Sequence, residues 1–117
     1  MTVCDLNGNL KFNILGPDWE KNKDNRKEYF SPTGVVVAKN YIIAAYLNEA
    51  GIIMDKQQRP RGNSPSKLMV FDINGNYIQT IETGHKFIRF CVDEENNRII
   101  AYFNDRLNPL GYFKLNL

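Results

Sequence analysis

The sequence of 117 residues has few of the features that identify common functional classes. No apolar run approaches the roughly 20 residues of a membrane-spanning helix, so no membrane span is predicted. The 15 basic and 13 acidic residues nearly balance, and a net charge of +2 gives no reason to expect a nucleic-acid partner. The first twelve residues lack the charged and apolar regions of a secretory signal, and the sequence does not indicate a cellular compartment.

Residues suited to catalysis, metal binding or cofactor binding are also scarce. His85 is the only histidine, and no cysteine or carboxylate cluster accompanies it. The segments "DLNGN" and "DINGN" place glycine at position four, whereas an EF-hand calcium loop needs it at position six. There is no G-x-x-x-x-G-K-[ST] phosphate loop. We therefore expect no metal, no cofactor and no catalytic residue, and we expect Cys4 and Cys91 to be buried free thiols.

What the sequence does contain is a repeated hairpin. "VCDLNGNL" at 3–10 is nearly the same phrase as "VFDINGNY" at 70–77, and apolar and polar residues alternate on either side of each Asn-Gly pair. Alternation with period two predicts strands. Asn-Gly between two strands favours a type I′ turn, in which both central residues have positive φ.

A second phrase repeats as well. "VVVAKNYIIAAYLN" at 35–48 aligns with "CVDEENNRIIAYFN" at 91–104 at an offset of 56, and "VFDIN" at 70–74 aligns with "YFKLN" at 112–116 at an offset of 42. Four strand types, a to d, then follow one another in a cycle. The predicted strands are c (2–6), d (9–14), a (33–38), b (41–48), c (67–73), d (76–82), a (87–93), b (98–104) and c (111–117). This cycle is typical of all-β proteins built from four-stranded antiparallel propeller blades.

The phrases "KLMVFDINGNYIQTIETG" and "RFCVDEENNRIIAYF" resemble the blade motifs of TolB-like six-bladed β-propellers, a family common in Bacteroidetes. The resemblance extends over 31–117 and more weakly over 1–16. It implies a binding scaffold that is often exported to the periplasm or cell surface, and it brings no catalytic residue to this chain.

The expected organisation is one partial propeller module: a half blade (1–16), a loop (17–32), a full blade (33–83) and an incomplete blade (84–117). Nine strands make about two and a quarter blades, and an incomplete blade has an exposed edge. Two explanations stay open. The chain is either the C-terminal part of a longer propeller, a purely structural blade set whose functional centre lies elsewhere, or a polypeptide that covers its exposed strand edges by forming a homo-oligomer.

Loop length indicates where a binding surface would lie. The a–b and c–d turns are all short, whereas the d–a loop 15–32 and the b–c loop 49–66 are long and should emerge together on the opposite face. Long loops on one face are typical of recognition surfaces. We expect this face to bind a protein, peptide or glycan, with a propeller hydrolase or lyase as the less favoured alternative. Candidate residues are those on this face without a counterpart in the repeat: Trp19, Arg26, Tyr29, Lys56, Arg59, Arg61, His85, Lys86 and Arg106.

Overall fold

The computed structural model describes residues 1–17, 19–22, 29–47 and 49–116, with the side chains of 21–33 left out. Strands dominate this part of the chain, and the one helix in it is the single turn α1 (Trp19–Asn22). The strands are β1 (Thr2–Cys4), β2 (Leu10–Asn13), β3 (Tyr29–Ala38), β4 (Tyr41–Leu47), β5 (Ile52–Met54), β6 (Pro60–Gly62), β7 (Lys67–Asp72), β8 (Tyr77–Glu82), β9 (Arg89–Asp93), β10 (Arg98–Tyr102) and β11 (Leu110–Lys114). The all-β class and the nine predicted strands are confirmed.

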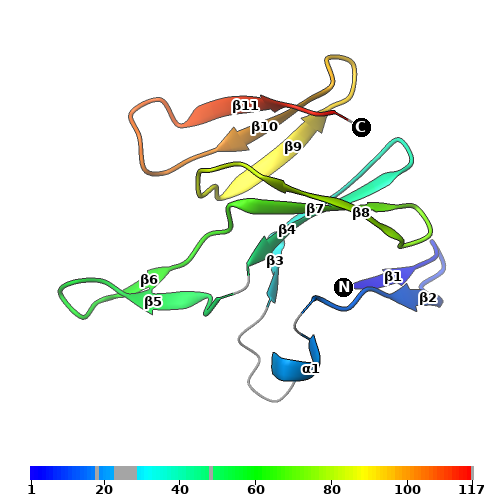
Figure 1. Ribbon diagram of the computed structural model, residues 1–117, viewed down its shortest axis with the longest axis horizontal. Coiled ribbons are helices and arrows are strands. Elements are labelled where there is room, and N and C mark those ends of the chain that lie inside the picture. The colour runs from blue at the N-terminus through cyan, green and yellow to red at the C-terminus, as the bar shows by residue number, and fades with distance from the viewer. Residues whose placement is uncertain (18, 23–28, 48, 117) are drawn as a thin grey trace.

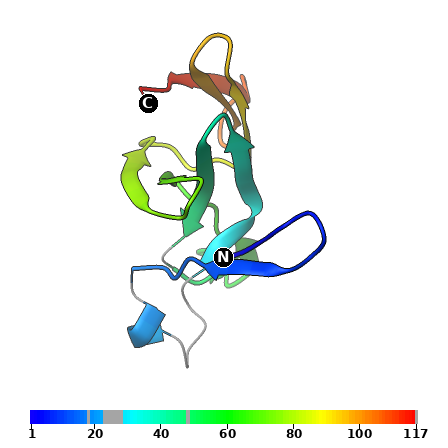
Figure 2. The ribbon, with the colours of Figure 1, turned by 90° about the vertical axis from the view of Figure 1, so that its right-hand side faces the viewer.

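The strands form a central four-stranded sheet with a smaller sheet on each side. The central sheet has the order β3-β4-β7-β8, and its neighbours are the β1–β2 hairpin and a three-stranded sheet β11-β10-β9. All pairs are antiparallel. Figures 1 and 2 show the three sheets one after another, with β9–β11 at the top and β1–β2 lowest.

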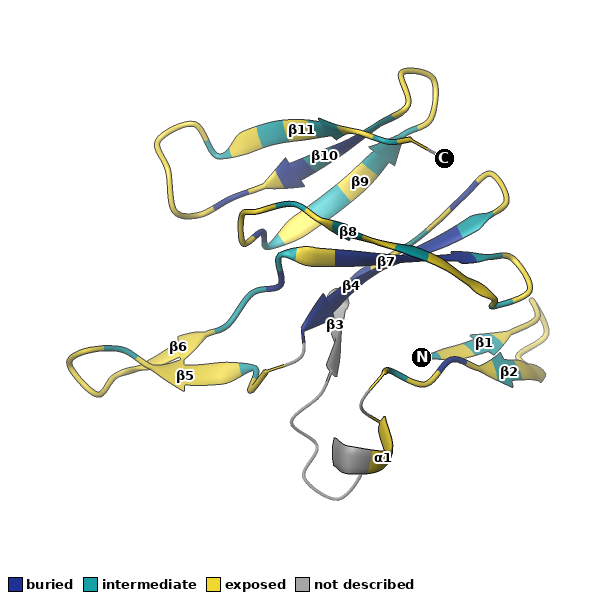
Figure 3. Cartoon of the chain, in the orientation of Figure 1, coloured by how far each residue is buried: buried dark blue, intermediate teal, exposed yellow. Residues whose placement is uncertain are grey.

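Both faces of the central sheet are covered by side chains of its neighbours. One buried cluster joins it to the β9–β11 sheet and contains Ile43, Ala45, Leu68, Val70, Phe87, Ile99, Ala101 and Phe103. The other joins it to the β1–β2 hairpin and contains Ile14, Ile42, Ala44, Tyr46, Met69 and Phe71. Burial on both sides explains why β4, "YIIAAYL", is a continuous apolar run, and Figure 3 shows it dark blue.

We call the face of a sheet that points toward the next sheet along the chain its forward face, and the opposite one its backward face. In the β9–β11 sheet the forward face is turned away from the central sheet. Directly opposed residues of antiparallel strands lie on the same face. The pair Ile43–Val70 therefore marks the forward face of the central sheet, and the pair Ile42–Phe71 marks its backward face.

This assignment corrects the repeat of the a and b strands. An offset of 56 equates Ile43 with Ile99, yet these two residues face each other across one core. The matching pairs are Ile43–Val70 and Ile100–Tyr112, both on forward faces, which gives an offset of 57 for the b strand. The a strand has an offset of 55, because the loop between Ala38 and Tyr41 has two residues and that between Asp93 and Arg98 has four. The predicted offset of 56 is one residue away from each of these values. A shift of one residue exchanges the two faces of a strand, so the prediction placed the side chains of both strands on the wrong face. The offset of 42 for the c strand agrees with the structure.

The two Asn-Gly corners also differ from the prediction. Gly8 and Gly75 have φ of 84° and 88°, but Asn7 and Asn74 are not among the described residues with positive φ. In each corner the glycine N–H donates to the aspartate carbonyl three residues earlier, Gly8 to Asp5 and Gly75 to Asp72. The corners are therefore three-residue loops that end in a left-handed glycine, not type I′ turns. The aspartate side chain selects this form by accepting two backbone N–H bonds from the loop.

Two segments that were expected to be loops contain strands. The segment 15–32 includes α1 and the start of β3, which begins at Tyr29 rather than at 33. The segment 49–66 contains the β5–β6 hairpin, and Pro65 near its end is buried. Residues 60–62 of this segment are therefore paired as a strand, whereas the whole of 49–66 was predicted to be a loop.

Candidate functional site

Three connections between strands converge on one side of the molecule and form a groove. They are the segments after β6, between β8 and β9, and after β10, and the groove has a volume of about 420 Å³. Its lining residues are Ile53, Gly62, Asn63, Ser64, Gly84, His85, Lys86, Asn104 and Asp105. The short corners lie on the other side, where the backbone N–H of Lys39 donates to Glu94 across two neighbouring turns. Figure 1 shows the corners on the right and the groove-forming connections on the left.

One wall of the groove is the β5–β6 hairpin. Its corner repeats the three-residue loop that follows Asp5 and Asp72, which we call the aspartate loop. The carboxylate of Asp55 accepts the backbone N–H groups of Gln57 and Arg59 at 2.9 Å. Gln58 takes the position of the glycine, with φ of 60°, and its N–H donates to the Asp55 carbonyl. "DKQQR" at 55–59 is thus a third copy of "DLNGN" and "DINGN", in which the glycine and both asparagines are replaced.

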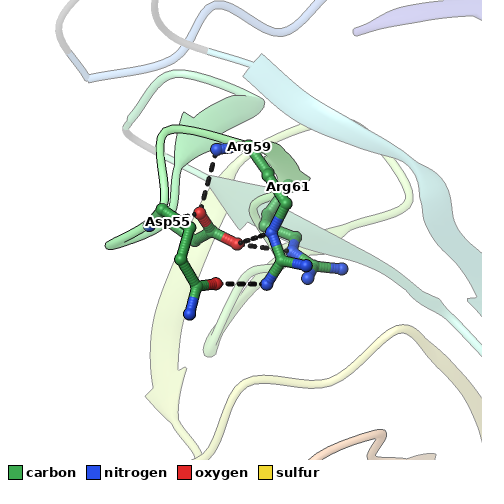
Figure 4. A network of polar contacts seen from close by, with 4 residues as sticks. Asp55, Arg59 and Arg61 are labelled. Atoms are coloured by element: carbon green, nitrogen blue, oxygen red, sulfur yellow. Dashed lines mark hydrogen bonds and ion pairs between the residues drawn. The ribbon is translucent and has the colours of Figure 1, made fainter.

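Asp55 also orients the two arginines of this hairpin. The Nε atoms of Arg59 and Arg61 lie 3.0 and 3.1 Å from the same oxygen of Asp55, and Arg59 donates to the Gln57 side chain (Figure 4). The Arg59 backbone N–H is the main cause that holds the pKa of Asp55 below its usual value, with the Arg61 side chain next among the lowering contacts. Because Arg61 pairs with Ile53, which lines the groove, it lies on the groove face of the hairpin. Ile52 and Met54 lie exposed on the other face.

The opposite wall carries a cluster of His85, Phe103 and Arg106. The Arg106 guanidinium lies 4.5 Å from the centre of the Phe103 ring, and one of its nitrogens lies 2.9 Å from His85 Nδ1. Arginine is always a donor, so Nδ1 accepts and the His85 proton is on Nε2. The His85 ring packs edge-on against the buried ring of Phe103, with 5.9 Å between the two ring centres. The imidazole is therefore held in one orientation, with Nε2–H as its remaining donor.

Lys86 is held by a chain of polar contacts between the two walls. Its Nζ donates to Asn63 Oδ1 at 2.7 Å, and the Asn63 amide donates to Glu49 at 2.9 Å. None of the ion pairs found in the described part of the chain involves Lys86. The contact links the β8–β9 connection to the segment after β6.

The structure brings together most of the predicted site residues. His85 and Lys86 line the groove, Arg106 contacts His85, and Arg59 and Arg61 lie on the hairpin that forms one wall. Lys56 lies exposed in the corner of that hairpin. Trp19 lies on α1, half exposed, and is not a lining residue. Tyr29 belongs to β3, but its side chain and the whole of Arg26 are outside the described residues.

The sequence did not single out Asn63, Ser64, Asn104, Asp105 or the buried Phe103. Asn104 was not a candidate because it ends the repeated phrase 91–104. The aspartate that begins "DKQQR" was the available signal for the β5–β6 wall, because it aligns with Asp5 and Asp72.

The two cysteines are free, as expected, but both are exposed, so the prediction that they are buried is wrong. Cys4 and Cys91 lie on the outer faces of the first and last sheets, which no further sheet covers here. Among the described residues no group of three or more His, Cys, Asp or Glu side chains could hold a metal ion. The same residues include no helix that is long and apolar enough to cross a membrane.

Comparison with known proteins gives no assignment: no family model, no curated protein and no solved structure matches this chain.

Proposed function

We propose that this chain is a non-enzymatic binding module of a β-propeller, related to the TolB-like family, and that the groove binds a protein or peptide. The propeller arrangement is supported by the repeat, because successive sheets present equivalent residues in the same direction, as blades around one axis do. The binding function is supported above all by the groove itself. Three connections from two sheets meet there, while the corner side has a smaller cavity of about 40 Å³ between the turns at Lys39 and Asn97.

The chemistry of the groove suits a polypeptide. Asn63, Asn104 and Ser64 offer donors and acceptors that match backbone amides, and Lys86 and His85 Nε2 add donors for a carbonyl or carboxylate. On the far face of the hairpin wall, Ile52 and Met54 are apolar and exposed, which favours a protein or peptide over a glycan. His85 Nδ1 is engaged by Arg106 rather than by a nucleophile, and this supports a binding role.

The test is selection of ligands from a displayed random peptide library against the purified chain, with a glycan array in parallel. Peptides that bind at the groove should lose at least about 10-fold in affinity when Lys86→Ala and Arg106→Ala are combined, equivalent to about 1.4 kcal/mol. Lys11→Ala, an exposed lysine on β2, is the matched control and should leave affinity unchanged.

Peptides whose binding is insensitive to the double variant would remove the groove from the proposal. Binding of glycans alone would change the ligand class. No ligand from either library would contradict the binding function.

A further inference from the structure

The forward face of the β9–β11 sheet carries an apolar patch of Ile100, Tyr102, Leu110 and Tyr112, bordered by Arg89 and by the charged row Asp93, Arg98 and Lys114. Cys91, Ile100 and Tyr112 form one cross-strand row on it, and Arg89, Tyr102 and Leu110 form the next. Tyr112 and Leu110 are 64% and 68% exposed, and Figure 3 shows β11 with alternating exposed positions. Arg98 lies at one end of the face, with its guanidinium 5.4 Å from the Tyr112 ring and its Nε paired with Asp93 at 2.7 Å. An apolar patch with a charged rim has the composition of a protein interface.

The repeat shows what such a face does elsewhere in this chain. The equivalents of Ile100, Tyr112 and Leu110 in the central sheet are Ile43, Val70 and Leu68, which are 0 to 1% exposed. They are buried because the backward face of the β9–β11 sheet packs on them. The exposed face is therefore one unmatched half of an interface that the molecule already makes once.

Part of the other half is exposed at the opposite end of the stack of sheets, along the edge strand β3, whereas Ile42, Ala44, Met69 and Phe71 of the same face are buried. Val35 and Val37 of β3 pair with Ala44 and Ile42 and so lie on the backward face of the central sheet. The β1–β2 hairpin covers the rest of that face but leaves Val37 63% exposed. The equivalents of Val35 and Val37 in the next sheet are Phe90 and Val92, which pack against the core between the sheets.

We propose that this surface docks a second copy of the chain head to tail, with the forward face of β9–β11 on one copy against the Val35–Val37 face of the next. Each copy carries the open forward face and the uncovered β3 part of the backward face, so the contact would reproduce the β3 side of the internal sheet-to-sheet interface between two molecules. A contact between two different surfaces of identical chains is heterologous, and it closes into a ring or extends as a filament. This assembly is independent of any ligand in the groove.

Two single variants test the proposal by complementation. Tyr112→Asp places a charge on the forward face, and Val37→Asp places one on the backward face. Both side chains are exposed in the single chain, so both variants should keep the wild-type circular dichroism spectrum and a cooperative thermal transition, with a melting temperature that no longer rises with concentration. By light scattering after size exclusion, the wild type should exceed the 13.5 kDa of one chain and grow in mass with concentration. Each variant alone should be monomeric, its dissociation constant raised by more than about 10-fold.

An equimolar mixture of the two variants should form dimers of twice the monomer mass, because each supplies the face that the other has lost. Leu107→Asp, in the exposed loop after β10, is the control for adding an aspartate and should associate like the wild type. A monomeric wild type from about 10 µM to about 1 mM overturns the proposal. So does association of Val37→Asp alone, which would mean that two forward faces meet, and so does a mixture that stays monomeric.

Discussion

The central sheet and the β9–β11 sheet are two copies of one strand pattern in different surroundings. Ile43 and Ile100 are equivalent residues of the same type, but Ile43 is fully buried and Ile100 lies on an open face. The sequences of β4 and β10, "YIIAAYL" and "RIIAY", hardly differ at this position. Burial is therefore decided by which sheet lies in front, and the local sequence alone does not reveal it.

Substitution of these two isoleucines tests the comparison most directly. Ile43→Ala should lower the free energy of unfolding by about 3 to 4 kcal/mol, because it opens a cavity between two sheets. Ile100→Ala should lower it by less than about 1 kcal/mol. Both are measured by urea unfolding in the Val37→Asp background, which prevents association through that face. Equal losses would mean that the open face of β9–β11 is as tightly packed as the core.

A glycine of the central sheet gives the next largest effect. A Cβ at Gly34 would lie 2.3 Å from Ala45 Cβ and 3.1 Å from a ring carbon of Phe90. Gly34→Ala should therefore cost about 2 to 3 kcal/mol, because β3 must shift away from its neighbours. The equivalent residue of the β9–β11 sheet is the exposed Arg89, and Arg89→Ala should change stability by less than about 0.5 kcal/mol. Thermal unfolding of both variants in the Val37→Asp background would show whether the close approach is confined to the covered sheet.

The pairs Ile43–Ile100 and Gly34–Arg89 also show how much of the structure could be predicted from the sequence. Alternation and turn residues located every strand of the repeat, because period two and Asn-Gly are local signals. The face of the sheet on which each side chain of the a and b strands lies was predicted wrongly. The second a–b turn is two residues longer than the first, so one offset cannot align both strands. The β5–β6 hairpin was missed because Gln58 occupies a position where glycine is the expected marker. His85, Lys86 and Arg106 were found by their lack of a counterpart, whereas Phe103 was not, since its role depends on packing.

Acid should affect the corners of both sheets alike. The Asn76 side chain is the main cause that holds the pKa of Asp72 below its usual value, and the Asn96 side chain, followed by Arg98, does the same for the pKa of Asp93. A lowered folded-state pKa stabilises the protein above the unfolded value of about 3.9 and loses this contribution as the pH falls below it. The contribution of these two carboxylates to stability should thus be level from pH 7 to about pH 5 and decline below about pH 4.

Asp72→Asn and Asp93→Asn should each make this decline shallower, while each lowers stability at neutral pH. Urea unfolding at a series of pH values measures both effects. A decline of unchanged steepness in both variants would show that the acid sensitivity arises outside these corners.

The smallest effect concerns the connection in which the two sheets differ most. The central sheet has the β5–β6 hairpin between its b and c strands, and the β9–β11 sheet has only residues 103–109 there. In Gln58→Gly the strain of a positive φ disappears while the unfolded chain gains freedom, so the corner should gain only about 0.5 kcal/mol. Hydrogen exchange of the Asp55 amide, which donates to the Arg59 carbonyl, should then slow by about 2-fold. Gln57→Gly, one residue earlier and without positive φ, should speed the same exchange. If both variants change the rate in the same direction, the corner of this groove wall does not have the aspartate loop of the other two hairpins.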